Sequence, residues 1–310
     1  MVTKQQFFIT PIPPFRLDLT VWALRRRAHN QVDVWDGSSY HRAILLHGGR
    51  VADVQVVQAT PPSAGHLKVG VSGVRLDAGI KRELRQILVR MLGTDIDLRP
   101  FYALTAGDRR MAPLVACFRG LKPPRFPSLF EALVNGIACQ QLSLTVGITL
   151  LNRLSERFGV RGSAGGHAFP APAQLAGRDP AELRALGFSG QKVRALLGLA
   201  EAVRDGSVDM PSFETSANTD AVRRLSMLRG VGRWTAEYVL LRGLGRLDVF
   251  PGDDVGARKR LAEWLKAAEP LDYAAVGKAL RRWHPYAGLL YFHLLLKGLA
   301  DTGELDAEFA

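Results

Sequence analysis

Cysteine is nearly absent from this sequence, because a chain of 310 residues holds only Cys117 and Cys139. Neither has another cysteine or a histidine at metal-ligand spacing, so a zinc site and a four-cysteine iron–sulfur cluster are excluded. Both stand in apolar stretches, and we expect reduced thiols inside the core. The sequence therefore predicts no metal site.

Long apolar runs are also missing. The N-terminal residues MVTKQQFFITPIPP lack the apolar centre of a signal peptide. No stretch reaches the about 18 apolar residues that a membrane span needs. We therefore expect a protein that is neither secreted nor membrane-bound, located in the cytoplasm or on the nucleoid.

Acidic residues are in deficit. The chain has 41 Lys and Arg residues against 29 Asp and Glu, which gives a formal net charge of +12 and a pI near 10.1. This balance favours a polyanionic partner such as nucleic acid, although a basic protein without one has the same composition. The length predicts two or three domains, and a hydrophobic content of 47% is ample for their cores.

The secondary structure that the sequence predicts changes once along the chain, near residue 111. Residues 1–111 predict an α/β domain with helices at 15–27 and 81–92, a hairpin at Gly48-Gly49, and strands at 6–10, 32–35, 40–46, 51–59 and 67–71. Residues 112–300 show helical periodicity throughout, and an acidic tail follows at 301–310. Arg25, Arg26 and Arg27 are interpreted as a solvated helix end, and the glycine-rich segment 162–166 as a flexible surface loop.

The stretch 225–260, LSMLRGVGRWTAEYVLLRGLGRLDVFPGDDVGARKR, carries the candidate chemistry. Gly230 and Gly232 interrupt a helical pattern. Such a turn lets backbone N–H groups face a phosphate, and this contact does not depend on the base sequence. A plain helix–helix turn has a similar sequence, so that alternative stays open. Asp253 and Asp254 precede another helix, where an aspartate caps the N-terminus and stays ionised.

The segment LRGVGRWTAEYVLLRGLGRLDVFPGDD resembles the signature of the helix-hairpin-helix DNA glycosylases, in particular the alkylbase (3-methyladenine) glycosylase II branch. Three more segments resemble helices of that branch, so the similarity covers about residues 112–300: FPSLFEALVNGIACQQLSLTVG, LGFSGQKVRALLGLA and RRWHPYAGLLYFHLLL. The resemblance implies an α+β fold, with an N-terminal antiparallel β-sheet domain bearing two helices and an all-α core of two helical subdomains. It implies a monomeric base excision repair enzyme that binds damaged double-stranded DNA and flips out the damaged base.

The resemblance also assigns roles to residues. It makes Asp254 the catalytic carboxylate, places the DNA wedge at Gln140, Gln141 and Leu142, and implies no cofactor except a monovalent cation at the hairpin. The phosphate-binding hairpin would comprise Leu228, Gly230, Gly232, Arg233 and Thr235.

Trp234 stands where related enzymes with lyase activity carry a lysine. Without that amine no Schiff base forms, so a monofunctional hydrolase is implied. Trp234 and Tyr238 share one helix face and are expected to line a pocket for a cationic alkylated purine.

Two positions depart from the branch. A relative has an aliphatic residue where Gln141 falls and a pocket tryptophan where Leu295 falls. Phe15, Tyr286 and Tyr291 are candidates to replace the missing ring. Two alternatives stay open: the same fold acting on deaminated, etheno or oxidised bases, and a non-catalytic DNA-binding module, which has no need of Asp254. A basic helical protein without a DNA role is a third.

Overall fold

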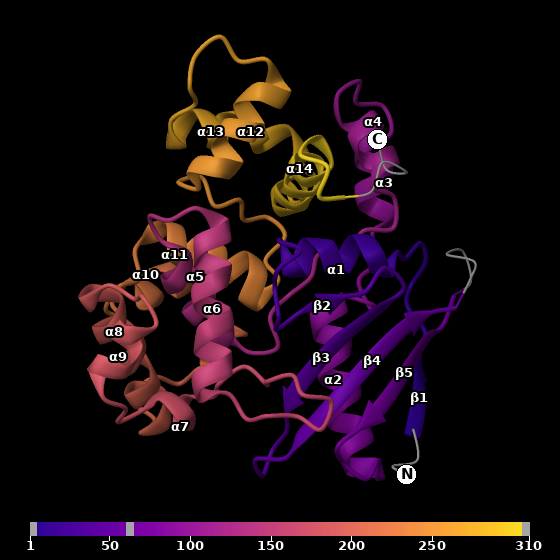
Figure 1. The fold of residues 1–310 in the computed structure, drawn as a ribbon. Helices are drawn as coiled ribbons and strands as arrows, with labels where there is room; N and C mark the ends of the chain where they lie inside the picture. Colours follow the sequence, from indigo (N-terminus) through magenta and orange to yellow (C-terminus); the bar gives the residue numbers. More distant parts are fainter. Residues whose placement is uncertain (1–4, 60–64, 306–310) are drawn as a thin grey trace.

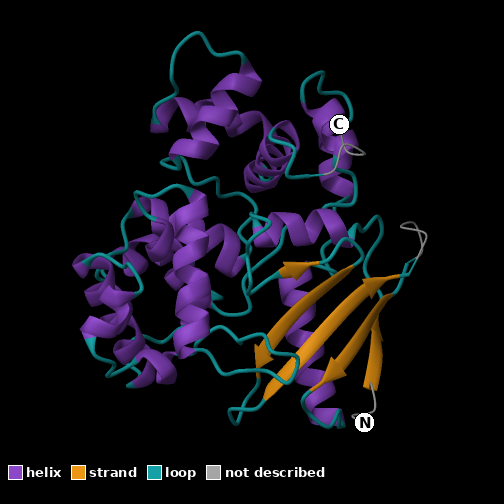
Figure 2. Cartoon of the chain, in the orientation of Figure 1, coloured by secondary structure: helices purple, strands orange, loops and turns teal. Residues whose placement is uncertain are grey.

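A computed structural model describes residues 5–59 and 65–305 of the chain. The strands form one five-stranded sheet. Figure 1 shows it on one side of the molecule, with helices gathered beside and above it. Figure 2 separates the same two parts by secondary structure, with strands confined to the first quarter of the chain. The predicted α+β fold is confirmed.

All strands of the sheet pair antiparallel, in the order β1-β5-β4-β3-β2. The predicted hairpin between β3 and β4 is confirmed, because both Gly48 and Gly49 adopt positive φ angles in its turn. The strand bounds agree with the sequence pattern to within two residues: β1 Gln5–Ile9, β2 Val34–Trp35, β3 Ser39–Leu45, β4 Val51–Gln58 and β5 Leu67–Ser72.

The two helices predicted for the first third are present as α1 (Leu17–Arg25) and α2 (Ala78–Leu92). Two short helices, α3 (Arg99–Thr105) and α4 (Met111–Cys117), were not predicted, because seven residues are too few to show a helical period. They lie beside α14 in Figure 1, at the end of the molecule away from α7.

The remaining chain is helical, as its periodicity predicts. Ser143, Asp179 and Ser189 cap the N-termini of α6, α8 and α9 with side-chain oxygens that accept backbone N–H groups. The bounds are α5 Leu129–Cys139, α6 Leu144–Phe158, α7 Pro172–Leu175, α8 Pro180–Ala185, α9 Gly190–Arg204, α10 Asn218–Ser226, α11 Arg233–Val239, α12 Val255–Leu265, α13 Tyr273–Leu280 and α14 Ala287–Asp301. Short turns of other helix types occur at η1 Pro211–Phe213, η2 Leu240–Leu244 and η3 Arg281–Trp283.

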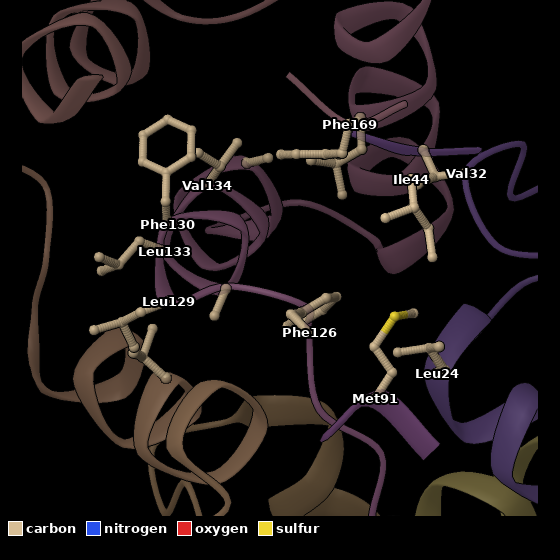
Figure 3. Packing of buried hydrophobic residues seen from close by; sticks show 14 of the residues in the cluster. Leu24, Val32, Ile44, Met91, Phe126, Leu129, Phe130, Leu133, Val134 and Phe169 are labelled. Carbon is tan, nitrogen blue, oxygen red and sulfur yellow. The ribbon is translucent and has the colours of Figure 1, made fainter. Parts of the chain in front are cut away.

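Buried apolar side chains form two clusters, and each includes residues from both sides of position 111. The first joins the sheet to α5, α6, α9 and α11. Figure 3 shows part of it, with Phe126 between the side chains of α5 and those of Leu24 and Met91. The second joins α1, α3 and α4 to α12–α14. The division into domains at 111, with a tail from 301, stays a prediction.

A buried ionic group fixes the sheet against α5. Arg42 on β3 donates to Asp33 at 2.7 Å and to both carboxylate oxygens of Glu131 on α5, at 2.7 and 2.6 Å. Tyr40 donates to the same Asp33. Removing one member of such a buried pair typically costs about 3–5 kcal/mol. The sheet therefore holds α5 in place, and α5 ends where the candidate site begins.

Three expectations from sequence are wrong. Cys117 is exposed, because α4 presents it to solvent. The glycine-rich loop is anchored, since Ser163 and Ala164 donate hydrogen bonds to Asp53 on β4. Arg25 and Arg26 are buried, each only 4% exposed, because the chain after α1 folds back over them. Sequence spacing could not reveal these long-range contacts.

Candidate active site

The helices α10 and α11 form the predicted hairpin. Its two glycines have different backbone conformations and different surroundings. Gly230 has φ +79, and a Cβ there would lie 2.7 Å from the Cβ of Ala195. Gly232 is the N-cap of α11 with extended backbone, and a Cβ there would meet nothing within 4 Å. Packing therefore requires glycine at 230, whereas nothing in the protein itself requires it at 232.

The other predicted hairpin residues face in different directions. Arg233 is half-exposed, pairs with Asp253 at 2.7 Å and lies over the ring of Tyr273 at 3.8 Å. Leu228 is partly buried and packs on the first cluster. Thr235 is buried, so its side chain cannot reach a phosphate; its backbone N–H lies in the first turn of α11, where such groups lack helical partners.

The two carboxylate oxygens of Asp254 have different hydrogen-bond partners. Its Oδ1 accepts the N–H of Ala257 at 2.8 Å and caps α12. Its Oδ2 accepts from the indole N–H of Trp234 and from the hydroxyl of Tyr291, both at 3.2 Å. Burial and the charge of Asp254 raise the pKa of Tyr291, so that hydroxyl stays protonated and donates. The carboxylate is therefore fixed from three sides and only partly exposed.

Glu237 holds the loop that carries this carboxylate, a role that sequence reasoning missed. It is buried on α11 and accepts from the backbone N–H of Gly252 at 3.1 Å and from the hydroxyl of Tyr273. Burial raises the pKa of Glu237. Burial also raises the pKa of Tyr273 to about 12, and the bond to Glu237 adds to this rise. The loop before Asp254 is thus tied to the hairpin helix.

A cavity of about 810 Å³ opens beside Asp254. Trp234 and Tyr238 both line it, with ring centroids 5.6 Å apart and planes inclined by 31°. Leu295 and Tyr291 also line it, whereas Phe15 and Tyr286 pack inside the two clusters. Of the three rings considered as replacements, Tyr291 is therefore the one that faces this cavity.

Two arginines from the first third of the chain also line the cavity. Arg26 donates to the hydroxyl of Tyr238 at 2.9 Å and to Oδ1 of Asn135 at 2.6 Å. Arg27 pairs with Glu304 at 3.4 Å. Sequence reasoning missed both, because no local pattern brings the end of α1 to the hairpin.

The segment 140–143, here called the wedge loop, borders the cavity. Gln140 donates from Nε2 to the carbonyl of Gly230 and to Oγ1 of Thr235, both at 2.7 Å. Its own carbonyl accepts from Lys192 at 2.8 Å. Gln141 has φ +53, and the side chain of Leu142 is 42% exposed. Gln140 is thus tied to the hairpin, while Gln141 and Leu142 form the projecting tip.

The described residues hold no group of three or more His, Cys, Asp or Glu side chains placed to bind a metal ion. In the same part of the chain, no helix is both long and apolar enough to cross a membrane. The hairpin carbonyl of Gly230 uses one lone pair for Gln140. A carbonyl oxygen has a second lone pair, which can coordinate a cation. This turn is therefore compatible with the predicted monovalent cation.

The chain is similar to several known proteins. Residues 134–285 match the model of the HhH-GPD superfamily of base excision DNA repair proteins. DNA-3-methyladenine glycosylase 2 of Escherichia coli is 28% identical over 285 residues, 91% of this chain and 94% of that protein. DNA-3-methyladenine glycosylase 1 of Schizosaccharomyces pombe is 30% identical over 177 residues, 57% of this chain and 74% of that protein. The solved 3-methyladenine DNA-glycosylase of Archaeoglobus fulgidus superposes with a TM-score of 0.81 at 25% identity, covering 94% of this chain and 97% of its own.

Proposed function

The chain belongs to the HhH-GPD superfamily of base excision DNA repair proteins, and on that premise we propose that it is a monofunctional DNA glycosylase for alkylated purines. The substrates are purines of the 3-methyladenine and 7-methylguanine type in double-stranded DNA. The names of its relatives as 3-methyladenine glycosylases support this substrate class. The enzyme acts as a monomer on chromosomal DNA.

The observation that carries the proposal is the Asp254 carboxylate, held at the edge of the cavity by Trp234 and Tyr291. Cleavage of the C1′–N bond leaves its electron pair on the base and positive charge on the sugar. A fixed carboxylate stabilises that charge. A base alkylated at a ring nitrogen is already cationic, so it departs neutral and needs no acid. Water adds hydroxide to C1′ and its proton is lost to Asp254 and then to solvent.

The residues around the cavity support monofunctional action. Trp234 occupies the position of the lyase lysine, and no lysine is among the described residues that line the cavity. The nearby Lys192 donates to the carbonyls of Ala138 and Gln140 and holds the wedge loop. Among the residues that the structure describes, no amine lines the cavity where it could form a Schiff base at C1′.

The surfaces around the cavity account for DNA binding. The backbone N–H groups at the start of α11 and the half-exposed Arg233 contact phosphates without reading sequence. Gln141 and Leu142 fill the gap left by the flipped base, whose extrusion costs a few kcal/mol. The net charge of +12 adds attraction that weakens with salt.

The test is single-turnover release of 7-methylguanine from a duplex by the Asp254→Asn variant, with Asp253→Asn as the matched control. Asp254→Asn should lose about a hundredfold or more in rate, the scale of losing a fixed electrostatic contact, with duplex affinity retained. Asp253→Asn loses only the pair with Arg233 and should keep most of the activity. Equal losses in both variants would refute the assignment. Borohydride should trap no enzyme–DNA adduct, and an adduct would refute monofunctional action.

A further inference from the structure

Tyr273 belongs to α13, outside the hairpin and outside the loop that carries Asp254, yet it contacts both. Its hydroxyl donates to Oε1 of Glu237 on α11. The guanidinium of Arg233, also on α11, lies 3.8 Å from the centre of its ring. A Cβ added to Gly252 would lie 2.8 Å from Cδ2 and Cε2 of the same ring, so the loop backbone packs directly against it. One side chain therefore holds the loop and the hairpin helix together.

Glu237 makes the second connection between the same two parts. It is only 7% exposed, and its Oε2 accepts the backbone N–H of Gly252 at 3.1 Å while its Oε1 accepts from Tyr273. Burying a carboxylate is costly unless its oxygens are bonded, so loss of either bond is resisted. Glu237 and Tyr273, here called the clamp, thus fix Gly252 through both its N–H group and its packing.

The clamp acts on the turn that presents Asp254. The backbone N–H of Asp254 donates to the carbonyl of Pro251 at 3.0 Å, which closes a tight turn around Gly252. Neither clamp residue lines the cavity beside Asp254, whereas both line a separate pocket of about 570 Å³ together with Gly252. The clamp therefore does not touch a base in the cavity, and its effect on the reaction must pass through the turn.

The hairpin helix is the other part that the clamp holds. Arg233 uses Nε and Nη2 for Asp253, each at 2.7 Å, and a guanidinium has five N–H donors, so donors remain for a DNA phosphate. A phosphate bound at the start of α11 and the sugar of the flipped nucleotide belong to one strand. The distance from that sugar to Asp254 therefore depends on how firmly the turn is joined to α11.

We propose that Glu237 and Tyr273 are positioning residues, which join the turn of Asp254 to the phosphate-binding helix so that DNA bound at the hairpin meets the carboxylate at a fixed distance. The inference rests on the proposed glycosylase function and adds two residues to its machinery. A misplacement of about 1 Å can cost about a hundredfold in rate. Loss of the clamp should slow the chemical step and change DNA affinity little, because the phosphate-binding groups remain.

The experiment measures single-turnover release of 7-methylguanine at saturating enzyme, together with the Kd for a duplex that carries an abasic analogue. Tyr273→Phe removes the hydroxyl and keeps the ring against Gly252 and Arg233, whereas Glu237→Ala removes both bonds of the carboxylate. We expect the rate to fall about tenfold in Tyr273→Phe, the worth of one hydrogen bond to a charged group, and about a hundredfold in Glu237→Ala. The Kd should change less than about threefold in both. The double variant should be no slower than Glu237→Ala, because the hydroxyl then has no partner left to lose.

Tyr102→Phe is the matched control. Tyr102 is a partly buried tyrosine on α3, and its hydroxyl accepts the backbone N–H of Gly120 at 3.1 Å. This variant therefore also removes one tyrosine hydrogen bond, at a residue that does not line the cavity. Its rate should stay within about twofold of wild type.

The inference is overturned by an unchanged rate in Tyr273→Phe, by an equal fall in Tyr102→Phe, or by a loss of affinity as large as the loss of rate. If Glu237→Ala does not fold, Tyr273→Phe decides alone. A wild-type enzyme that releases no 7-methylguanine refutes the proposed function, and the inference with it. A wild-type enzyme that releases this base no faster than the two variants refutes the clamp alone, which separates the two failures.

Discussion

The indole N–H of Trp234 donates to Oδ2 of Asp254 at 3.2 Å, across a sequence separation of 20 residues. This bond links the first turn of the hairpin helix α11 to the N-cap of α12. The residue that replaces the lyase lysine thus orients the proposed catalytic carboxylate as well as lining the cavity. Loss of the bond should affect the chemical step more than DNA binding.

Trp234→Phe tests this relationship, because it keeps an aromatic wall and removes the N–H donor. We expect the single-turnover rate to fall about tenfold, the worth of one hydrogen bond to a charged group. Affinity for a duplex with an abasic analogue should change less than about threefold. Trp264→Phe is the control, since Trp264 packs on Trp283 away from the cavity. A rate equal to wild type in Trp234→Phe would contradict the orienting role.

The two hairpin glycines should respond differently to alanine. Gly230→Ala places a Cβ into Ala195 at a positive φ, so we expect a loss of about 1–3 kcal/mol in the free energy of unfolding. Gly232→Ala meets nothing in the protein and should leave the melting temperature nearly unchanged. If the hairpin binds a phosphate as proposed, this variant should nevertheless weaken binding to all duplexes, because the added Cβ would crowd the phosphate at the start of α11. Unchanged DNA affinity in Gly232→Ala would remove the hairpin from the DNA interface.

We expect Gln140 and Leu142 of the wedge loop to have different roles, with Gln140 as the anchor and Leu142 as the tip. Leu142→Ala should slow release of a correctly paired lesion by about tenfold, which corresponds to about 1.4 kcal/mol of lost support for the extruded base, and have less effect on a mispaired one. Gln140→Ala frees the loop from Gly230 and Thr235 and should slow both substrates alike. Release from paired and mispaired duplexes, measured side by side, checks this. Equal sensitivity to pairing in the two variants would contradict the division.

The burial of His293 in the second cluster predicts that the folded protein loses stability in acid. It is buried between Phe101 and Phe118, and burial lowers its pKa from the usual 6.5 to about 4. Because the folded pKa lies below the unfolded one, the unfolded chain binds the extra proton. Stability is therefore full above about pH 6.5 and falls as the pH drops toward 4, by about 3 kcal/mol.

His293→Phe should flatten this dependence between pH 6.5 and 4, as measured by chemical denaturation at several pH values. His47→Gln is the control, because His47 is exposed. A wild-type stability that stays constant over this window would show that His293 does not carry the effect.

Local signals were enough to predict most of the fold. Alternating and helical patterns located every strand of the sheet, the two long helices of the first third and the helical character of residues 112–300. The same kind of signal placed Trp234 and Tyr238 on one face and Asp254 before a helix. The short helices α3 and α4 escaped because their patterns are shorter than the period that reveals a helix.

The long-range contacts could not be predicted. Arg26 looked like part of a solvated charge run, yet it lies in the cavity wall against residues of α5 and α11. Tyr291 was one of three unplaced rings, and only the packing of α14 beside α12 brings it to Asp254. Glu237 looked like an ordinary helix residue until the loop at Gly252 folded onto it.

The sequence by itself determined the elements and the hairpin, because these depend on spacing along a few turns of chain, and its resemblance to a known family identified Asp254 as the candidate carboxylate. The tertiary structure alone decided what surrounds that carboxylate. Trp234 and Tyr291 orient it, Glu237 secures its loop, and Arg26 lies in the wall of the same cavity. Such an arrangement depends on which buried surfaces pack together, and that choice is made by the summed burial of the two clusters rather than by any local pattern.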